Sequence, residues 1–105
     1  MPNFMKMLKQ AGEIQKNMTK AQAELAEQIL TATAGGEAVT VTITGTGDIK
    51  SIKIAPDAVK SGDPEMLEDL VLAAVQSAQA LARDTSSKTM AKLTNGLQLP
   101  PGFGF

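Results

Sequence analysis

The chain contains no cysteine and no histidine among its 105 residues. Their absence removes disulfide bonds, thiolate nucleophiles, the common zinc ligands and the side chain that most often acts as a general base near neutral pH. Only carboxylates, lysines and hydroxyls are left for catalysis. We therefore expect a protein that is not an enzyme, that binds no metal ion or other cofactor and that has no small-molecule substrate. The alternative is an enzyme that uses carboxylates alone for catalysis.

Tryptophan and tyrosine are also missing, and phenylalanine occurs three times. Single-stranded bases stack on aromatic side chains, so recognition of a single strand is not expected. Arg83 is the one arginine, which leaves little capacity to read guanine edges. Long apolar runs are absent as well, so we expect no membrane span and no membrane partner, and a location in the cytoplasm. The length suits a single domain, residues 1–105, with one modest core.

The first predicted element is a helix over residues 1–34. From Phe4 onward this stretch has no proline and one glycine, and Gly35-Gly36 follows it as a stop signal. Apolar residues recur at three- and four-residue spacing from Phe4 to Leu25. A helix of about 30 residues is about 45 Å long, longer than a globule of this size needs. Its apolar stripe therefore lies either within the protomer or against a second chain.

A block of strands is predicted over residues 37–60. Val39, Val41 and Ile43 alternate with threonines, which is the period of a strand with one apolar face. Residues 45–48 are typical of a turn and residues 49–54 of a second strand, so we expect a hairpin. Residues 57–59 are a candidate for a short third strand.

A second long helix is predicted over residues 63–95. Asp63-Pro64-Glu65 combines an N-cap, a proline in the first turn and an acidic residue near the positive end of the helix dipole. These roles explain the acidic residues nearby better than a metal site does. Residues 96–105 are predicted to form an irregular tail rich in proline and glycine. Its apolar residues either fold back onto an apolar surface or are presented to a partner.

The formal net charge is -1, but the basic residues are concentrated in two stretches of the chain. Taken alone, each stretch is explained by a solvated polar face. In a dimer both stretches are doubled, and together they form a surface wide enough to contact phosphates. The candidate DNA-binding residues are therefore Lys6, Lys9, Lys16, Lys20, Arg83, Lys88 and Lys92.

The succession of segments resembles the YbaB/EbfC family of nucleoid-associated proteins over essentially the full chain. The resemblance rests on the Met- and Lys-rich first helix, the strand block after Gly35-Gly36, the segment Asp63–Leu70 and the tail Leu97–Phe103. It implies an α+β protomer with a small antiparallel sheet between two helices, a tweezer-like homodimer, and binding of duplex DNA with little sequence requirement. The family tail usually continues with a lysine and a Met-Pro-Phe ending, whereas Gly104-Phe105 stands here.

We therefore predict a nucleoid-associated protein that binds double-stranded DNA through phosphate contacts, acts in the cytoplasm on the nucleoid, and influences nucleoid organisation and gene expression. The alternative is an adaptor or chaperone-like protein that binds protein partners through its methionine-rich helix and its tail. For the homodimer, the apolar residues most in need of cover are the expected interface: Val39, Val41, Ile43, Met18 and Leu25.

Overall fold

The computed structural model describes residues 3–96, and side chains as far as Leu93, as a three-stranded antiparallel sheet covered by one long helix. Its elements in chain order are α1 (Phe4–Glu27), β1 (Ile29–Ala34), β2 (Val39–Thr44), β3 (Ile49–Ile54), α2 (Pro56–Lys60) and α3 (Pro64–Gly96). The predicted α+β class is confirmed: in the order of the chain, one long helix precedes a small antiparallel sheet and another follows it. Gly96, predicted as the first residue of the irregular tail, is instead the last residue of α3, and the rest of the predicted tail lies outside the described residues.

Helix α1 begins at a defined cap and ends earlier than predicted. The Asn3 side chain accepts a hydrogen bond from the backbone N–H of Lys6 at 3.2 Å, which satisfies one of the free donors of the first turn. The helix ends at Glu27, and the backbone N–H of Gln28 bonds to the carbonyls of the preceding turn. The prediction of one helix over residues 1–34 is therefore wrong for its last residues.

Those residues form β1, the strand that the sequence did not reveal. It pairs antiparallel with β2, from Ile29 opposite Thr44 to Ala34 opposite Val39. Leu30, Ala32 and Ala34 are half-buried and pack on the core, while the residues between them are exposed. These residues are extended in spite of their helical propensity, because backbone pairing with β2 and burial against α3 stabilise a strand more than a continued helix.

Strands β2 and β3 form the predicted hairpin, and the sheet order is β1-β2-β3. The turn between them contains Gly47 at a φ of 97°, a conformation that favours glycine. Residues 57–59 are helical within α2, so the third strand expected there is wrong. Pro56 stands at the first position of α2, where its missing N–H costs no helical hydrogen bond.

Helix α3 starts where the sequence predicted and covers one face of the sheet. The Asp63 carboxylate accepts a hydrogen bond from the backbone N–H of Met66 at 3.1 Å, so this acidic residue serves as the cap. The helix packs on β1 and β2 through small side chains that allow a close approach. The buried core consists of Val39, Val41 and Ile43 with Ala74, Ala78 and Ala82.

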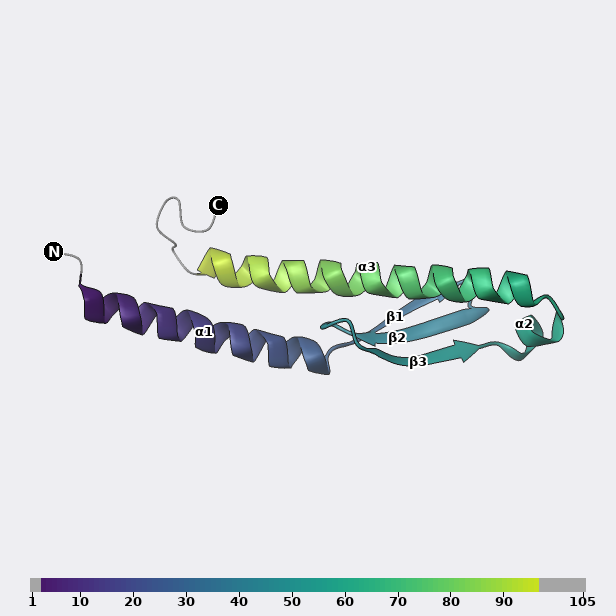
Figure 1. The fold of residues 1–105 in the computed structure, drawn as a ribbon, viewed down its shortest axis with the longest axis horizontal. Helices are drawn as coiled ribbons and strands as arrows, with labels where there is room; N and C mark the ends of the chain where they lie inside the picture. The colour runs from purple at the N-terminus through teal and green to yellow at the C-terminus, as the bar shows by residue number, and fades with distance from the viewer. Residues whose placement is uncertain (1–2, 97–105) are drawn as a thin grey trace.

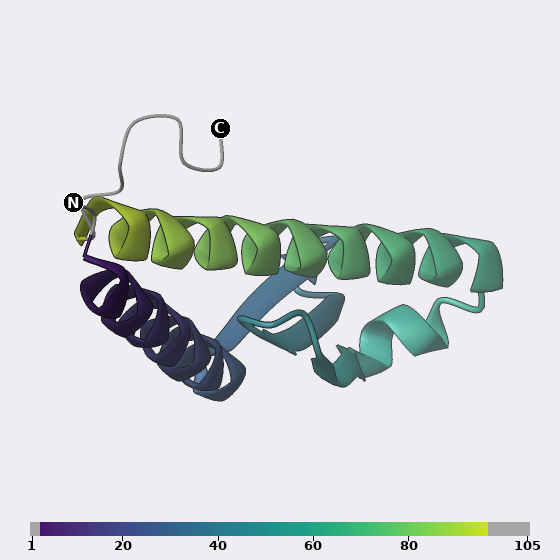
Figure 2. The same ribbon diagram turned by 60° about the vertical axis from the view of Figure 1, so that its left-hand side comes forward.

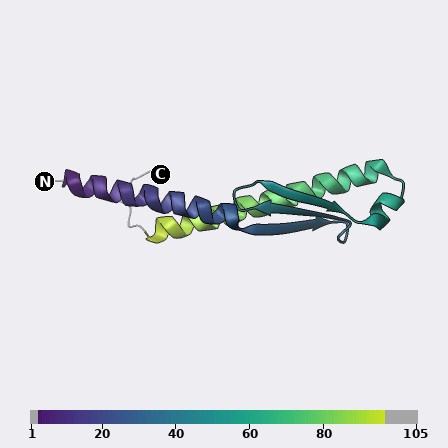
Figure 3. The same cartoon turned by 90° about the horizontal axis from the view of Figure 1, so that it is seen from below.

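The molecule is elongated, because both long helices run past the same end of the sheet (Figures 1 and 2). Its principal extents are 72 × 24 × 16 Å and its radius of gyration is 19.9 Å. A compact chain of this length would have a radius of gyration of about 13 Å. Seen from below, α1 continues the long axis of the sheet, with the strands in front of α3 (Figure 3). A two-helix projection thus extends from a sheet-containing base.

Candidate nucleic-acid interface

The projection, which we call the arm, comprises α1 and residues 82–96 of α3. It contains all seven candidate DNA-binding residues, against four acidic residues, Glu13, Glu24, Glu27 and Asp84. The rest of the chain has three basic and seven acidic residues. Folding therefore brings two basic stretches that are more than 60 residues apart in the sequence into one cationic arm, and leaves the base acidic.

The lysines of α1 lie on the exposed side of that helix. Lys9, Lys16 and Lys20 are seven and four residues apart, a spacing that keeps them near one face. All three are exposed, whereas Ala21 and Leu25 on the other side of α1 are buried. The lysines therefore remain accessible, and of the apolar side of the same helix only the part near Ala21 and Leu25 is buried in the protomer.

Lys20 and Lys92 come together across the arm. Both line a groove of about 340 Å³ between α1 and α3, together with Asn17 and Thr89. Glu24 also lines this groove, and Ala21 and Leu93 contribute its apolar part. Two ammonium groups from different helices, beside amide and hydroxyl donors, form a place where a phosphate backbone can lie.

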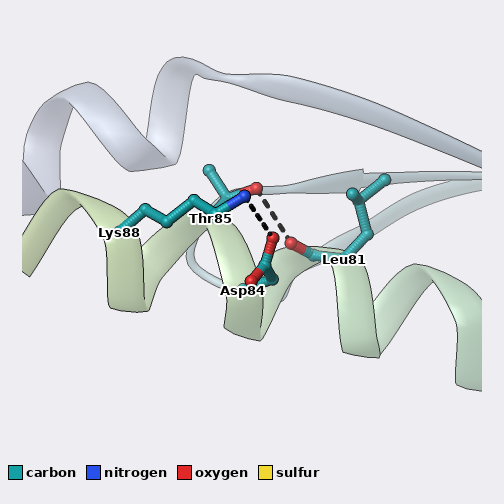
Figure 4. A network of polar contacts seen from close by, with 4 residues as sticks. All are labelled: Leu81, Asp84, Thr85 and Lys88. Carbon is teal, nitrogen blue, oxygen red and sulfur yellow. Dashed lines mark hydrogen bonds and ion pairs between the residues drawn. The ribbon is translucent and has the colours of Figure 1, made fainter.

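Lys88 is the one candidate lysine with an acidic partner within residues 3–93. Its ammonium lies 3.0 Å from the Asp84 carboxylate, one helical turn earlier (Figure 4). The two side chains are 74% and 57% exposed. An exposed pair at this spacing contributes only about 0.3–0.5 kcal/mol, so a phosphate can replace the carboxylate at little cost.

Arg83 lies apart from the lysine groove, on the side of α3 that faces the turn between β2 and β3. It lines a cleft of about 450 Å³ with Gly45, Thr46 and Gly47 of that turn. No ion pair involves its guanidinium within the described residues. The structure thus distributes six of the seven candidates over the exposed face of α1, the groove at Lys20 and Lys92, and the Arg83 cleft, while Lys88 is paired with Asp84 elsewhere on α3.

The expected dimer interface needs correction. Val39, Val41 and Ile43 have no exposed surface, because α3 covers them within the protomer, and Leu25 is 2% exposed. These four residues therefore provide no surface for a second chain. Met18, at 44% exposed, is the remaining member of that set that is accessible.

Apolar side chains are left exposed at the N-terminal end of α1, where Phe4 and Met5 are 68% and 74% exposed, and on β3. Ile52 and Ile54 pair with Val41 and Val39 and so face the same side of the sheet as α3, but they are 46% and 39% exposed. A bulge shifts the register between Thr42 and Ile43, so that Ile49 lies opposite Ile43 and joins this face. The alternation of residues 49–54 could have revealed two of the three isoleucines, but not the third.

Helix α3 also carries apolar residues that the protomer leaves uncovered. Leu67, Val71, Leu72 and Val75 line a hollow of about 440 Å³ together with Glu68, and the surface of the hollow is almost entirely apolar. Gln79, four residues after Val75 and on the same side of the helix, faces the turn between β2 and β3. The hollow therefore opens on the side of α3 nearer to β3. We use the name β3 face for the surface formed by the three isoleucines of β3 and the four apolar residues of the hollow, Leu67, Val71, Leu72 and Val75.

The described residues contain no cluster of His, Cys, Asp and Glu side chains with the geometry of a metal site. Among the same residues, no helix is both long enough and apolar enough to span a membrane.

Comparison with known proteins places the chain among DNA-binding proteins. Residues 1–97 match the model of the YbaB/EbfC DNA-binding family. A nucleoid-associated protein of Clostridium kluyveri is 48% identical over 101 residues, which are 96% of this chain and 89% of the relative. The nucleoid-associated protein NMC1380 of Neisseria meningitidis is 46% identical over 100 residues, covering 93% of this chain and 88% of that protein.

The fold is also found among solved structures. The crystal structure of the uncharacterized protein HP0035 from Helicobacter pylori superimposes with a TM-score of 0.80 at 15% identity. The match covers 89% of this chain and 98% of that protein. At this level of identity the similarity concerns the fold alone.

Proposed function

Because the chain belongs to the YbaB/EbfC DNA-binding family, we propose that it is a nucleoid-associated protein that binds duplex DNA along its cationic arm with little sequence preference. The observation that carries this proposal is the segregation of charge, with seven basic residues on the arm and an acidic base. Phosphate contacts by lysines supply affinity but read no bases. The site of action would then be the nucleoid in the cytoplasm, in keeping with the names of the relatives.

A salt titration of DNA affinity tests the role of the arm. The double variant Lys20→Gln/Lys92→Gln removes two charges from the groove, and Lys53→Gln/Lys60→Gln removes the same charge from the exposed surface of the base. Each lost phosphate contact should flatten the slope of log affinity against log salt by about 0.9. We expect a flatter slope for the arm variant and an unchanged slope for the base variant. Equal slopes in both variants would contradict the proposal.

Sequence tolerance is tested on the same protein with two duplexes of equal length and unrelated sequence. One arginine on the arm, with exposed lysines around it, provides few of the bidentate contacts that distinguish base pairs. We expect affinities within a few-fold of each other. A difference of a hundred-fold or more would indicate direct reading of bases.

We further propose that the functional unit is a homodimer joined through the β3 face. Three exposed isoleucines on an edge strand, beside an apolar hollow on α3, form a surface that a monomer would leave in water. A second copy of the chain is a suitable partner because a twofold axis would place the same apolar surface against itself. Such a dimer would carry two cationic arms and double the number of phosphate contacts.

The competing adaptor function has less support. It requires the methionine-rich side of α1 and the tail to bind proteins, whereas the matched family is a DNA-binding one. The proposal that the protein is not an enzyme and needs no cofactor continues to rest on the missing cysteine and histidine. Recovery of a stoichiometric protein partner after nuclease treatment would favour the adaptor.

A further inference from the structure

The Arg83 cleft has a different construction from the lysine groove. One wall is the turn Gly45–Gly47 between β2 and β3, and the other is the side of α3 that carries Gln79, Arg83, Ser86 and Ser87. The N–H groups of Gly45 and Gly47 and the hydroxyl of Thr46 have partners within the protein. The N–H of Gly47 bonds to the Thr44 carbonyl at 3.0 Å, and the Thr46 and Thr44 hydroxyls are 2.8 Å apart. The turn is therefore a fixed wall.

The α3 wall, by contrast, presents donors without partners. Hydroxyls on helices commonly bond to the carbonyl four residues earlier, as Thr85 does with Leu81 at 2.8 Å (Figure 4). Within the described residues, the hydroxyls of Ser86 and Ser87 make no such bond, and the Arg83 guanidinium has no acceptor. A planar fork of N–H donors beside two free hydroxyls is the donor set that binds a tetrahedral oxyanion.

The nearby carboxylates leave this donor set available. Asp84 follows Arg83 directly, but successive helical residues point about 100° apart, and its carboxylate is bonded to Lys88 at 3.0 Å. The Asp48 backbone N–H bonds to the Thr44 hydroxyl, and its carboxylate accepts weakly from the Thr46 hydroxyl at 3.4 Å. Neither carboxylate lines the cleft.

We propose that the Arg83 cleft binds one phosphoryl group, held by the guanidinium of Arg83 and the hydroxyls of Ser86 and Ser87. This proposal rests on the proposed function: the phosphoryl group belongs to the DNA backbone, at the place where the arm meets the base. The cleft would fix the position of the duplex on the protein, since a bidentate arginine defines geometry while exposed lysines supply only charge. A free phosphoanion presents the same chemistry and is the other source to be tested.

The test separates charge from hydrogen bonding in the full-length protein. Arg83→Gln removes a charged contact and should flatten the salt slope for duplex DNA by about 0.9 for each occupied cleft. Ser86→Ala/Ser87→Ala removes neutral donors, so it should weaken affinity roughly ten-fold while the slope stays unchanged. Arg83→Lys should restore the slope but not the full affinity, because an ammonium lacks the fork. Ser77→Ala, at an exposed position of α3 outside the cleft, is the matched control.

The outcomes distinguish this inference from the proposed function. If Lys20→Gln/Lys92→Gln flattens the slope while the cleft variants behave as wild type, the inference is overturned and DNA binding by the arm stands. If the wild type binds no DNA, amide NMR shifts with inorganic phosphate decide. If phosphate shifts the amide resonances of residues 45–47 and Arg83→Gln abolishes these shifts, the cleft is a site for free phosphate. If phosphate causes no such shifts, the proposed site is overturned.

Discussion

Replacing Ile52 by aspartate is the sharpest test of self-association through the β3 face. Ile52 is 46% exposed in the protomer, and its neighbours Ile49 and Ile54 are 43% and 39% exposed. Complete burial of such a side chain is worth about 1.5–3 kcal/mol. Covering the part that the protomer leaves in water therefore contributes about 1 kcal/mol for each isoleucine.

A twofold dimer contains the substitution twice. Loss of the apolar contribution alone removes about 2 kcal/mol, which weakens the dimer about 30-fold. Two carboxylates without partners at the interface add a desolvation cost and mutual repulsion. We therefore expect the dissociation constant of Ile52→Asp to rise by more than 30-fold, seen by sedimentation equilibrium as a monomer over a wide concentration range. The circular dichroism of the monomer should remain that of a folded α+β protein, because the side chain is not part of the core.

Ser51→Asp provides the matched control. Ser51 is the preceding residue of the same strand and pairs with Thr42, so it faces the opposite side of the sheet. The substitution Ser51→Asp introduces the same charge at an exposed position of β3. Equal dissociation constants for the two variants would refute the assignment of the β3 face as the interface.

Three further predictions concern the protomer and are measured as free energies of unfolding in urea. Gly45→Ala should destabilise by about 1–3 kcal/mol, because the new Cβ would lie 2.8 Å from the backbone carbonyl oxygen of Leu25, whereas Gly12→Ala on exposed α1 should stabilise by about 0.5–1 kcal/mol. Equal effects of the two would refute the close packing at the turn. Val41→Ala should cost about 2 kcal/mol, since it removes two fully buried methyl groups under α3, and a neutral result would contradict the core. Asp63→Ala should cost about 1 kcal/mol through loss of the α3 cap, and Asp63→Asn should recover most of it.

Much of the fold follows from local patterns in the sequence. The alternation of Val39, Val41 and Ile43 identifies β2, and the turn residues after it identify the hairpin. Asp63-Pro64 marks the start of α3 within one residue. Each of these signals is read from neighbours in the chain, because caps, turns and strand alternation are satisfied within a few residues.

The candidate site is predicted less completely. The sequence indicates which residues are basic, but not that Lys20 and Lys92 share a groove or that Arg83 meets the turn at Gly45–Gly47. These juxtapositions join segments far apart in the chain. They depend on how α3 crosses the sheet, which no local pattern records.

The sequence by itself determined that cysteine and histidine chemistry is absent, that the basic residues are concentrated in two stretches, and that a hairpin and a long second helix form. Tertiary structure decided that residues 29–34 are a strand, because Leu30 and its alternate neighbours gain more from burial against α3 than from helical hydrogen bonds. It also decided that Val41 is core while Ile52 beside it is surface, since α3 packs over β1 and β2 and leaves β3 uncovered. Both choices are made by the packing of one long helix on a narrow sheet, an interaction between residues that are neighbours only after folding.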